Sequence, residues 1–232
     1  MYMPFYYDPT FILVIIGMVI SMLASNYIQS TYRKYEKVSN RKGYKASDVA
    51  RMILTQSDID NVGITRISGD LTDNYNSQTK LLSLSDRVSE SRSVAAIGVA
   101  AHECGHAIQD KESYGPLRLR GALVPVVNFG AKLSIPLILL GGIFFGSSSI
   151  LINIGIWCFA LTFIFQVVTL PVEFNASRRA LNVLSEGNML EPDELSMARK
   201  VLIAAALTYV AAAITSLLQL VRLVLIFGNK RD

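Results

Sequence analysis

The sequence predicts a mainly α-helical integral membrane protein, with about four transmembrane helices and a small cytosolic α+β region. Apolar residues make up 51% of the 232-residue chain and charged residues only 17%, which excludes a disordered chain. Many of the apolar residues fall in long stretches that carry almost no charge. A helix of about 20 such residues crosses the ~30 Å hydrocarbon core of a bilayer. A domain of this size cannot bury four such stretches in one core, so we expect them to lie in a membrane.

Four spans are expected, at approximately residues 9–30, 122–145, 150–170 and 201–227. The second and third belong to one long apolar stretch that Gly146-Ser147-Ser148-Ser149 interrupts, and this break predicts a tight turn between two helices. We expect the whole chain, residues 1–232, to form one membrane-integrated domain.

The positions of Lys and Arg predict the orientation of the chain. Fourteen of the 22 basic residues lie between the first and second expected spans, and basic residues are enriched in cytoplasmic loops. We therefore expect a multi-pass protein of the cell membrane, with its N-terminus outside and residues 31–120 and 171–200 in the cytosol. Because the basic residues cluster beside the spans, the net charge of +4 indicates the lipid bilayer, and not nucleic acid, as a partner.

Residues 31–120 contain the signals for the small α+β region. Ser47-Asp48, followed by apolar residues at helical spacing, predicts an N-cap and a short amphipathic helix. Alternating residues over 62–67 and the stretch 80–85 predict two strands of a small hairpin or sheet, and the polar residues 73–77 predict a turn.

Both histidines of the chain, His102 and His106, fall in residues 93–110. This segment contains no Pro and is rich in Ala, Val and Ile, which predicts one long helix that ends by Gly115-Pro116. Four residues apart on a helix, the two imidazoles are separated by about 40° and lie one turn apart, where both could bind one tetrahedral Zn²⁺. The alternative is that two histidines share a helix face by chance.

Glu103 completes the pattern His-Glu-x-x-His (HExxH), which is typical of zinc metallopeptidases. Its side chain lies beside the histidine face, too far round the helix to be a ligand but placed to reach a metal-bound water. Cys104 points to the opposite side of the helix, so its thiol is not expected to bind metal. The pattern predicts one catalytic Zn²⁺ per chain.

A catalytic zinc ion needs a third protein ligand, and without a third histidine this ligand should be a carboxylate. Asp110 is excluded because it lies ~12 Å along the helix axis from His102, whereas acids upstream of the motif stay open. Glu173 is the strongest candidate because it follows the third span, so the chain returns it to the cytosolic side, where the motif helix also ends.

The residues around Glu173 predict a second helix that starts at Thr169 and Pro171 and stops at Gly187. A Glu in the first turn of a helix is also favoured by the helix dipole, so a purely structural role for Glu173 is the alternative.

Ala101-His102-Glu103-x-x-His106, followed two spans later by Glu173-Phe174-Asn175-Ala176-Ser177-Arg178-Arg179-Ala180, resembles the YugP-like membrane zinc metallopeptidases. A more distant similarity is to the HtpX-type membrane gluzincins, and the resemblance covers most of the chain after residue 30. It implies a zincin-like fold built into the membrane, with the two histidines and Glu173 as zinc ligands and Glu103 as the catalytic glutamate. HtpX-type enzymes place Asp four residues after the ligand Glu to orient a metal-bound histidine, whereas this chain has Ser177, a weaker partner for an imidazole.

These residues predict a membrane-bound, zinc-dependent endopeptidase in which a metal-activated water attacks the peptide bond and Glu103 is the general base. Ser177 and Arg178 are expected to lie beside the metal ligands. Tyr209 is a candidate for stabilising the oxyanion, and Arg178 and Tyr75 are further candidates.

The expected substrates are proteins or peptides, with membrane proteins and unfolded segments as candidates. A substrate chain could pair with a sheet edge near residues 80–85, although an ordinary structural strand explains this segment equally well. The alternative function is a non-catalytic, zinc-stabilised membrane scaffold or binding protein.

Overall fold

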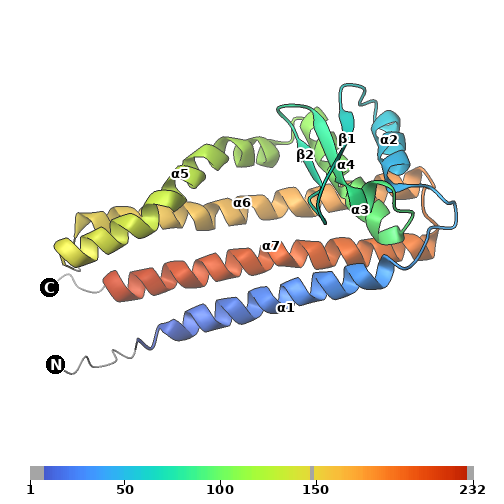
Figure 1. The fold of residues 1–232 in the computed structure, drawn as a ribbon. Helices are drawn as coiled ribbons and strands as arrows, with labels where there is room; N and C mark the ends of the chain where they lie inside the picture. The colour runs from blue at the N-terminus through green and yellow to red at the C-terminus, as the bar shows by residue number, and fades with distance from the viewer. Residues whose placement is uncertain (1–7, 147–148, 229–232) are drawn as a thin grey trace. The chain divides into compact units, whose positions relative to one another are not determined.

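The computed structural model describes residues 8–146 and 149–228, and this part of the chain is mainly helical (Figure 1). Its chain order is α1 (Phe11–Tyr35), α2 (Ala46–Gln56), β1 (Gly63–Ile67), β2 (Asn74–Asn76), β3 (Leu81–Ser85), α3 (Asp86–Ser89), α4 (Val94–Lys111), α5 (Gly115–Phe144), α6 (Ile150–Glu186) and α7 (Pro192–Phe227). The expected turn between the second and third spans includes residues 147–148, which lie outside the described residues.

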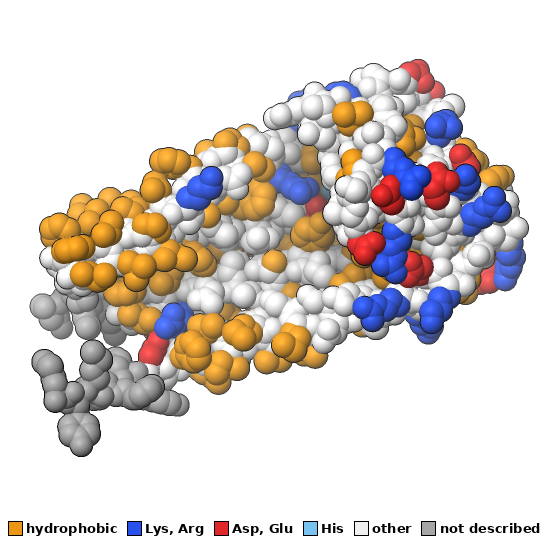
Figure 2. Space-filling view, viewed as in Figure 1, with side chains coloured by type: hydrophobic (Ala, Val, Ile, Leu, Met, Phe, Trp, Pro, Cys, Tyr) orange, Lys and Arg blue, Asp and Glu red, His pale blue; other side chains and the backbone are white. Residues whose placement is uncertain are grey.

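The chain divides into two compact units, of which the first comprises residues 1–24, 120–168 and 209–232. It contains the apolar parts of α1, α5, α6 and α7, and each of these four helices is long and apolar enough to cross a membrane. Hydrophobic side chains cover much of their surface in Figure 2. The prediction of four apolar helices is confirmed, whereas the expectation of one integrated domain stays a prediction.

Small residues allow close helix contacts within the first unit. A Cβ atom on Gly155 of α6 would lie 2.6 Å from a side-chain carbon of Ile138 and 2.9 Å from the carbonyl oxygen of Ser134, both in α5. The Ser134 hydroxyl donates a 2.8 Å hydrogen bond to the Gly155 carbonyl. This is the packing that membrane helices use, because small side chains let two backbones approach.

Polar contacts connect α1 and the residue before it to α7 in the same unit. Thr215 donates a hydrogen bond to the carbonyl of Gly17, and its hydroxyl lies 3.0 Å from that of Ser21. Asp8, just before α1, pairs with Arg222 near the end of α7 at 2.7 Å. The start of α1 therefore lies beside the end of α7.

The prediction that a separate helix begins at Thr169 and Pro171 is wrong, because α6 runs without interruption from Ile150 to Glu186. Proline removes only one backbone hydrogen bond, and a long helix can tolerate that loss when its neighbouring turns keep theirs. Glu173 consequently lies deep within α6 and not in a first turn. The helix dipole therefore does not explain why a Glu occupies this position.

The second unit, residues 25–119 and 169–208, contains a three-stranded sheet in the order β1-β3-β2. β1 runs parallel to β3 with Gly63 opposite Leu81, and β2 runs antiparallel to β3 with Asn76 opposite Leu81. Residues 73–77 were expected to form a turn, but most of them form β2. The hairpin alternative is therefore wrong, and the small-sheet alternative is confirmed.

β3 is the central strand of this sheet, with Leu82 and Leu84 fully buried. The idea that a substrate pairs with an edge near residues 80–85 is therefore wrong, because β1 and β2 occupy the two sides of β3. Burial of the two leucines explains the apolar pattern of this segment as ordinary core packing.

Both helices predicted between residues 31 and 120 are present, but the N-cap predicted for the first is wrong. α2 begins at Ala46 with Lys45 as its N-cap, and not at Ser47-Asp48, because the carbonyl of Ser91 accepts the Ala46 N–H. α4 begins at Val94, where the Ser93 hydroxyl accepts the Ala96 N–H at 3.1 Å. The long helix predicted over residues 93–110 is confirmed.

Candidate metal centre

The site is built at a close contact between α4 and α6. A Cβ atom on Gly105 of α4 would lie 2.4 Å from the carbonyl oxygen of Ala176 in α6, so only glycine fits at this contact. His102 and His106 flank Gly105 on α4, and Glu173 lies one turn before Ala176 on α6. The close contact therefore allows side chains about 70 residues apart in sequence to meet.

The three side chains converge through one atom each. His102 Nε2 lies 3.2 Å from Glu173 Oε2, and His106 Nε2 lies 3.6 Å from the same oxygen. The two imidazole rings are 4.8 Å apart and nearly perpendicular. The Glu173 side chain is only 2% exposed, and both histidines are largely buried.

These distances fit a tetrahedral metal ion. Two ligand atoms bound at about 2.0–2.1 Å with a tetrahedral angle between them are separated by roughly 3.3 Å. The two measured nitrogen-to-oxygen distances lie on either side of this value. Two imidazoles and one carboxylate also leave a fourth coordination position for water, as catalytic zinc sites require. His102, His106 and Glu173 could therefore hold one metal ion.

Each imidazole has a polar partner on its other nitrogen. His102 Nδ1 lies 3.1 Å from the Ser177 hydroxyl, one turn after Glu173 on α6. His106 Nδ1 lies 3.0 Å from Oε1 of Gln109 on α4. Such contacts leave both Nε2 atoms directed toward Glu173, which is the arrangement that metal binding needs.

Glu103 lies beside the three convergent residues, and its environment differs from theirs. Its side chain is half-buried, and no described residue gives its carboxylate a hydrogen bond or an ion pair. Burial raises the pKa of Glu103 above its ordinary value, and the nearby histidines offset this only in part. A carboxylate of this kind binds a proton more readily than an exposed one.

The histidines and carboxylates also interact electrostatically. Burial by itself would lower the pKa of His106, but its contact with Glu173 and the charges of Glu103 and Glu173 raise it above its ordinary value. Cys104 lies on the other side of α4, near the carbonyl of Ala50, and burial raises the pKa of its thiol. Cys104 is thus separate from the cluster, as its place on the helix predicts.

Comparison with known proteins shows the family of this chain. Residues 10–228 match a protein-family model described as "Putative neutral zinc metallopeptidase". The chain belongs to this family. It is also 44% identical over 220 residues to "Putative membrane protease YugP" of Bacillus subtilis (strain 168), a match that covers 95% of this chain and 97% of that protein. No solved structure matches the chain significantly.

Membership of a zinc metallopeptidase family supports zinc as the ion for the three convergent side chains. The resemblance inferred from the two motifs is confirmed by both comparisons. The structure brings Ser177 to His102, as expected, although the role of each residue stays a prediction.

Two other expected residues, Arg178 and Tyr75, make no contact with the three convergent side chains among the described hydrogen bonds and ion pairs. Arg178 is exposed, and no described residue forms a hydrogen bond or ion pair with it. Tyr75 donates a 2.6 Å hydrogen bond to Asp110, which also pairs with Lys80, and burial and this bond raise the pKa of Tyr75. Tyr209 is half-buried, and its role stays a prediction.

Sequence reasoning missed four residues that shape the site: Gly105, Gln109, Asn175 and Arg179. Arg179, next to the expected Arg178, donates a 2.7 Å hydrogen bond to Asn175, and Asn175 accepts another from Gln109. The signal for Gln109 was its place three residues after His106, where a helix brings two side chains together. Gly105 gave no such signal, because its importance depends on α6.

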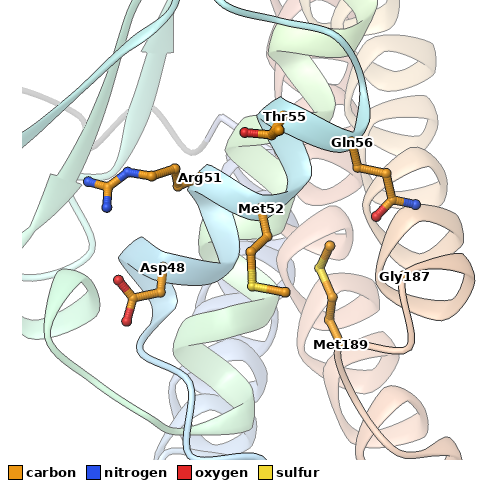
Figure 3. A pocket seen from close by; sticks show the side chains of 7 residues that line it. All are labelled: Asp48, Arg51, Met52, Thr55, Gln56, Gly187 and Met189. Atoms are coloured by element: carbon orange, nitrogen blue, oxygen red, sulfur yellow. The ribbon is translucent and has the colours of Figure 1, made fainter.

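A cavity of about 550 Å³ lies between α2 and the turn that follows α6 (Figure 3). Met52 and Met189 point toward one another across it, whereas Arg51 points away. Its lining includes none of the convergent residues, so it is separate from the candidate metal centre. The other lining residues are Asp48, Thr55, Gln56 and Gly187.

Proposed function

We propose that this chain is a membrane-bound, zinc-dependent endopeptidase of the gluzincin type, with a zincin-like HExxH helix in α4. In this proposal His102, His106 and Glu173 hold one Zn²⁺ per chain, and Glu103 is the general base. The observation that carries it is the convergence of three ligand atoms within 4.8 Å of one another, with both His–Glu distances near the tetrahedral value, beside a carboxylate without a hydrogen-bond partner among the described residues. Family membership supports the same chemistry.

A bound zinc ion supplies a Lewis acid that polarises a carbonyl group and lowers the pKa of a water molecule. Glu103 would accept a proton from the attacking water and pass it to the amine of the leaving group. Burial raises the pKa of Glu103, which brings its proton affinity closer to that needed near neutral pH. Because no described residue forms a hydrogen bond with Glu103, both of its oxygens are available for this transfer.

Tyr209 is retained as the proposed donor for the oxyanion, where a hydroxyl would stabilise the charge that develops on the carbonyl oxygen. Tyr75 is a weaker candidate because its hydroxyl hydrogen is already donated to Asp110. Ser177 is proposed to support His102 through its Nδ1 atom. Arg178 is exposed, and no contact of this kind supports a role for it beside the metal ligands.

The proposed location is the cell membrane, with four spans, the N-terminus outside and the site facing the cytosol. The pairing of Asp8 with Arg222 supports an even number of spans, because it places the start of α1 and the end of α7 at one end of the first unit. Proteins and peptides are the proposed substrates, including membrane proteins and unfolded segments that reach the membrane surface.

The test compares the wild-type chain with Glu103→Gln and with Glu186→Gln, an exposed position at the end of α6. All three are reconstituted in liposomes with equal zinc content and incubated with casein and with an unfolded membrane protein. Wild type and Glu186→Gln should cleave, whereas Glu103→Gln should lose activity by about 10²–10⁴-fold, the usual contribution of a general base.

If no variant cleaves any substrate, or if Glu103→Gln cleaves as fast as wild type, the peptidase mechanism is wrong. A rise in the thermal unfolding temperature on zinc addition without cleavage would instead favour the zinc-stabilised scaffold.

A further inference from the structure

Gln109 is a fully buried polar side chain at the contact between α4 and α6. Its amide oxygen faces Nδ1 of His106 at 3.0 Å. Its amide nitrogen donates to the carbonyl oxygen of Val172 at 2.8 Å and to Oδ1 of Asn175 at 2.9 Å, both on α6. All polar atoms of this side chain are therefore used.

These partners determine which end of the Gln109 amide faces which neighbour. The carbonyl of Val172 can only accept a hydrogen bond, so the amide nitrogen must face it. The amide oxygen must then face His106, and it can only accept. In the neutral imidazole, His106 Nδ1 therefore carries the hydrogen, and Nε2 carries the lone pair that a metal ion needs.

The orientation of Asn175 is determined in the same way. Arg179 has no acceptor atom, and its Nε donates to Oδ1 of Asn175 at 2.7 Å, so that atom must be oxygen. Arg179 is held in turn by Glu112 at 2.6 Å and by the ring of Tyr114. The chain of hydrogen bonds thus starts at a group that only donates.

The partner of His102 does not select one tautomer in this way. His102 Nδ1 contacts the Ser177 hydroxyl at 3.1 Å, and a hydroxyl can rotate to donate or to accept. Ser177 can therefore support either tautomer of His102, whereas Gln109 supports only one tautomer of His106.

We infer that Gln109 is a positioning residue that holds His106 in its Nδ1–H tautomer and so presents Nε2 to the metal. This inference rests on the zinc site of the proposed function. In this inference, the hydrogen bonds of Gln109 to Val172 and Asn175 on α6 help to orient His106, so the orientation does not depend on the HExxH motif alone.

The test uses the full chain in detergent, purified through a tag without histidine, labelled with ¹⁵N at histidine and loaded with zinc. Because the chain has two histidines, two-bond ¹H–¹⁵N spectra contain only two imidazoles, and they report which nitrogen of each ring carries hydrogen. Zinc affinity is measured separately by competition with a chelator. Neither measurement depends on peptide cleavage.

Gln109→Met fills similar space without hydrogen bonds and should weaken zinc binding by about 10–100-fold, the usual effect of losing a partner of a ligand histidine. The His106 Nδ1–H signal should lose its protection from solvent exchange, while the His102 signals stay in place. Ser177→Ala is the matched control, and it should change the His102 signals while leaving those of His106.

Gln109→Glu separates positioning from a merely structural role. A carboxylate still accepts the His106 Nδ1–H but cannot donate to Val172 or Asn175, so it should lower thermal stability yet restore zinc affinity above that of Gln109→Met. The inference would be overturned if Gln109→Met kept the wild-type zinc affinity and an unchanged His106 signal. It would also be overturned if Gln109→Met and Gln109→Glu lost zinc affinity equally. If the wild-type chain binds no zinc, both the proposed function and the inference about Gln109 are wrong.

Discussion

Among the helix contacts made at a glycine in the described residues, those at Gly155 and Gly105 have different roles. In the first unit, Gly155 of α6 lies against α5, and the Ser134 hydroxyl supplies a hydrogen bond there. In the second unit, Gly105 of α4 lies against Ala176 of α6, and titratable side chains surround the contact. Close backbone approach thus packs apolar helices in one place and brings the candidate metal ligands together in the other.

The difference lies in what flanks each glycine. Ile138 and Ser134 beside Gly155 fill space and make one hydrogen bond. His102 and His106 beside Gly105 can act only if α6 holds Glu173 within a few tenths of an ångström of its place. We therefore expect the first contact to affect stability alone and the second to affect both stability and metal binding.

The largest effect is expected from Glu173→Gln, which replaces the proposed carboxylate ligand near the Gly105 contact. An amide binds zinc poorly, so zinc affinity should fall by more than about 100-fold, beyond the loss typical of a residue that only supports a ligand. Chelator competition measures this, with Glu186→Gln at the exposed end of the same helix as the control. Unchanged affinity would move the third ligand to another acid.

A second prediction compares two glycines of α4. Gly105→Ala places a Cβ atom 2.4 Å from the Ala176 carbonyl, so the helices must separate. Overpacking of this kind costs about 1–3 kcal/mol in the free energy of unfolding, and zinc affinity should fall with it.

Gly98→Ala is the matched control on the same helix. Its Cβ would lie 3.5 Å from that of Ala198, an ordinary contact, and alanine stabilises a helix by about 0.5–1 kcal/mol relative to glycine. Denaturation in detergent and chelator competition measure both variants. A Gly105→Ala protein that binds zinc normally would show that the close contact does not position the ligands.

The same contrast shows what the sequence could predict. Long apolar runs predicted four membrane helices, because hydropathy adds up over some twenty residues and needs no tertiary partner. The spacing of His102 and His106 predicted a shared face, because helix geometry is local. Glu173 was predicted as the third ligand because the two spans after the histidine motif return the chain to the side of the membrane where the motif lies.

Features that depend on tertiary contacts were predicted poorly. Residues 74–76 have the composition of a turn and form β2 because β3 offers them an edge. Pro171 is a helix-start signal in short segments but lies inside the continuous α6. The partner of Gln109 lies 63 residues away along the chain, so no local pattern could indicate it.

A third prediction concerns the contact in the first unit. Gly155→Ala should lower the free energy of unfolding by about 1–2 kcal/mol, less than Gly105→Ala, because its Cβ would lie 2.9 Å from the Ser134 carbonyl oxygen, against 2.4 Å from the Ala176 carbonyl oxygen at Gly105. Zinc affinity should stay at the wild-type value. A loss of zinc affinity equal to that of Gly105→Ala would contradict the separation of roles between the two contacts.

The smallest expected effect is that of pH on thermal stability. Its direction should differ between the metal-free chain and the zinc-loaded chain. The raised pKa of His106 means that the folded, metal-free chain binds a proton more tightly than the unfolded chain. Its contribution to stability is fully present below the unfolded pKa of about 6.5 and is lost as the pH rises through the folded value. Zinc binds the neutral imidazole, so zinc affinity should rise over the same pH range. Thermal unfolding between pH 6 and 8, with zinc and with a chelator, should therefore give slopes of opposite sign, and parallel slopes would mean that His106 does not bind the metal.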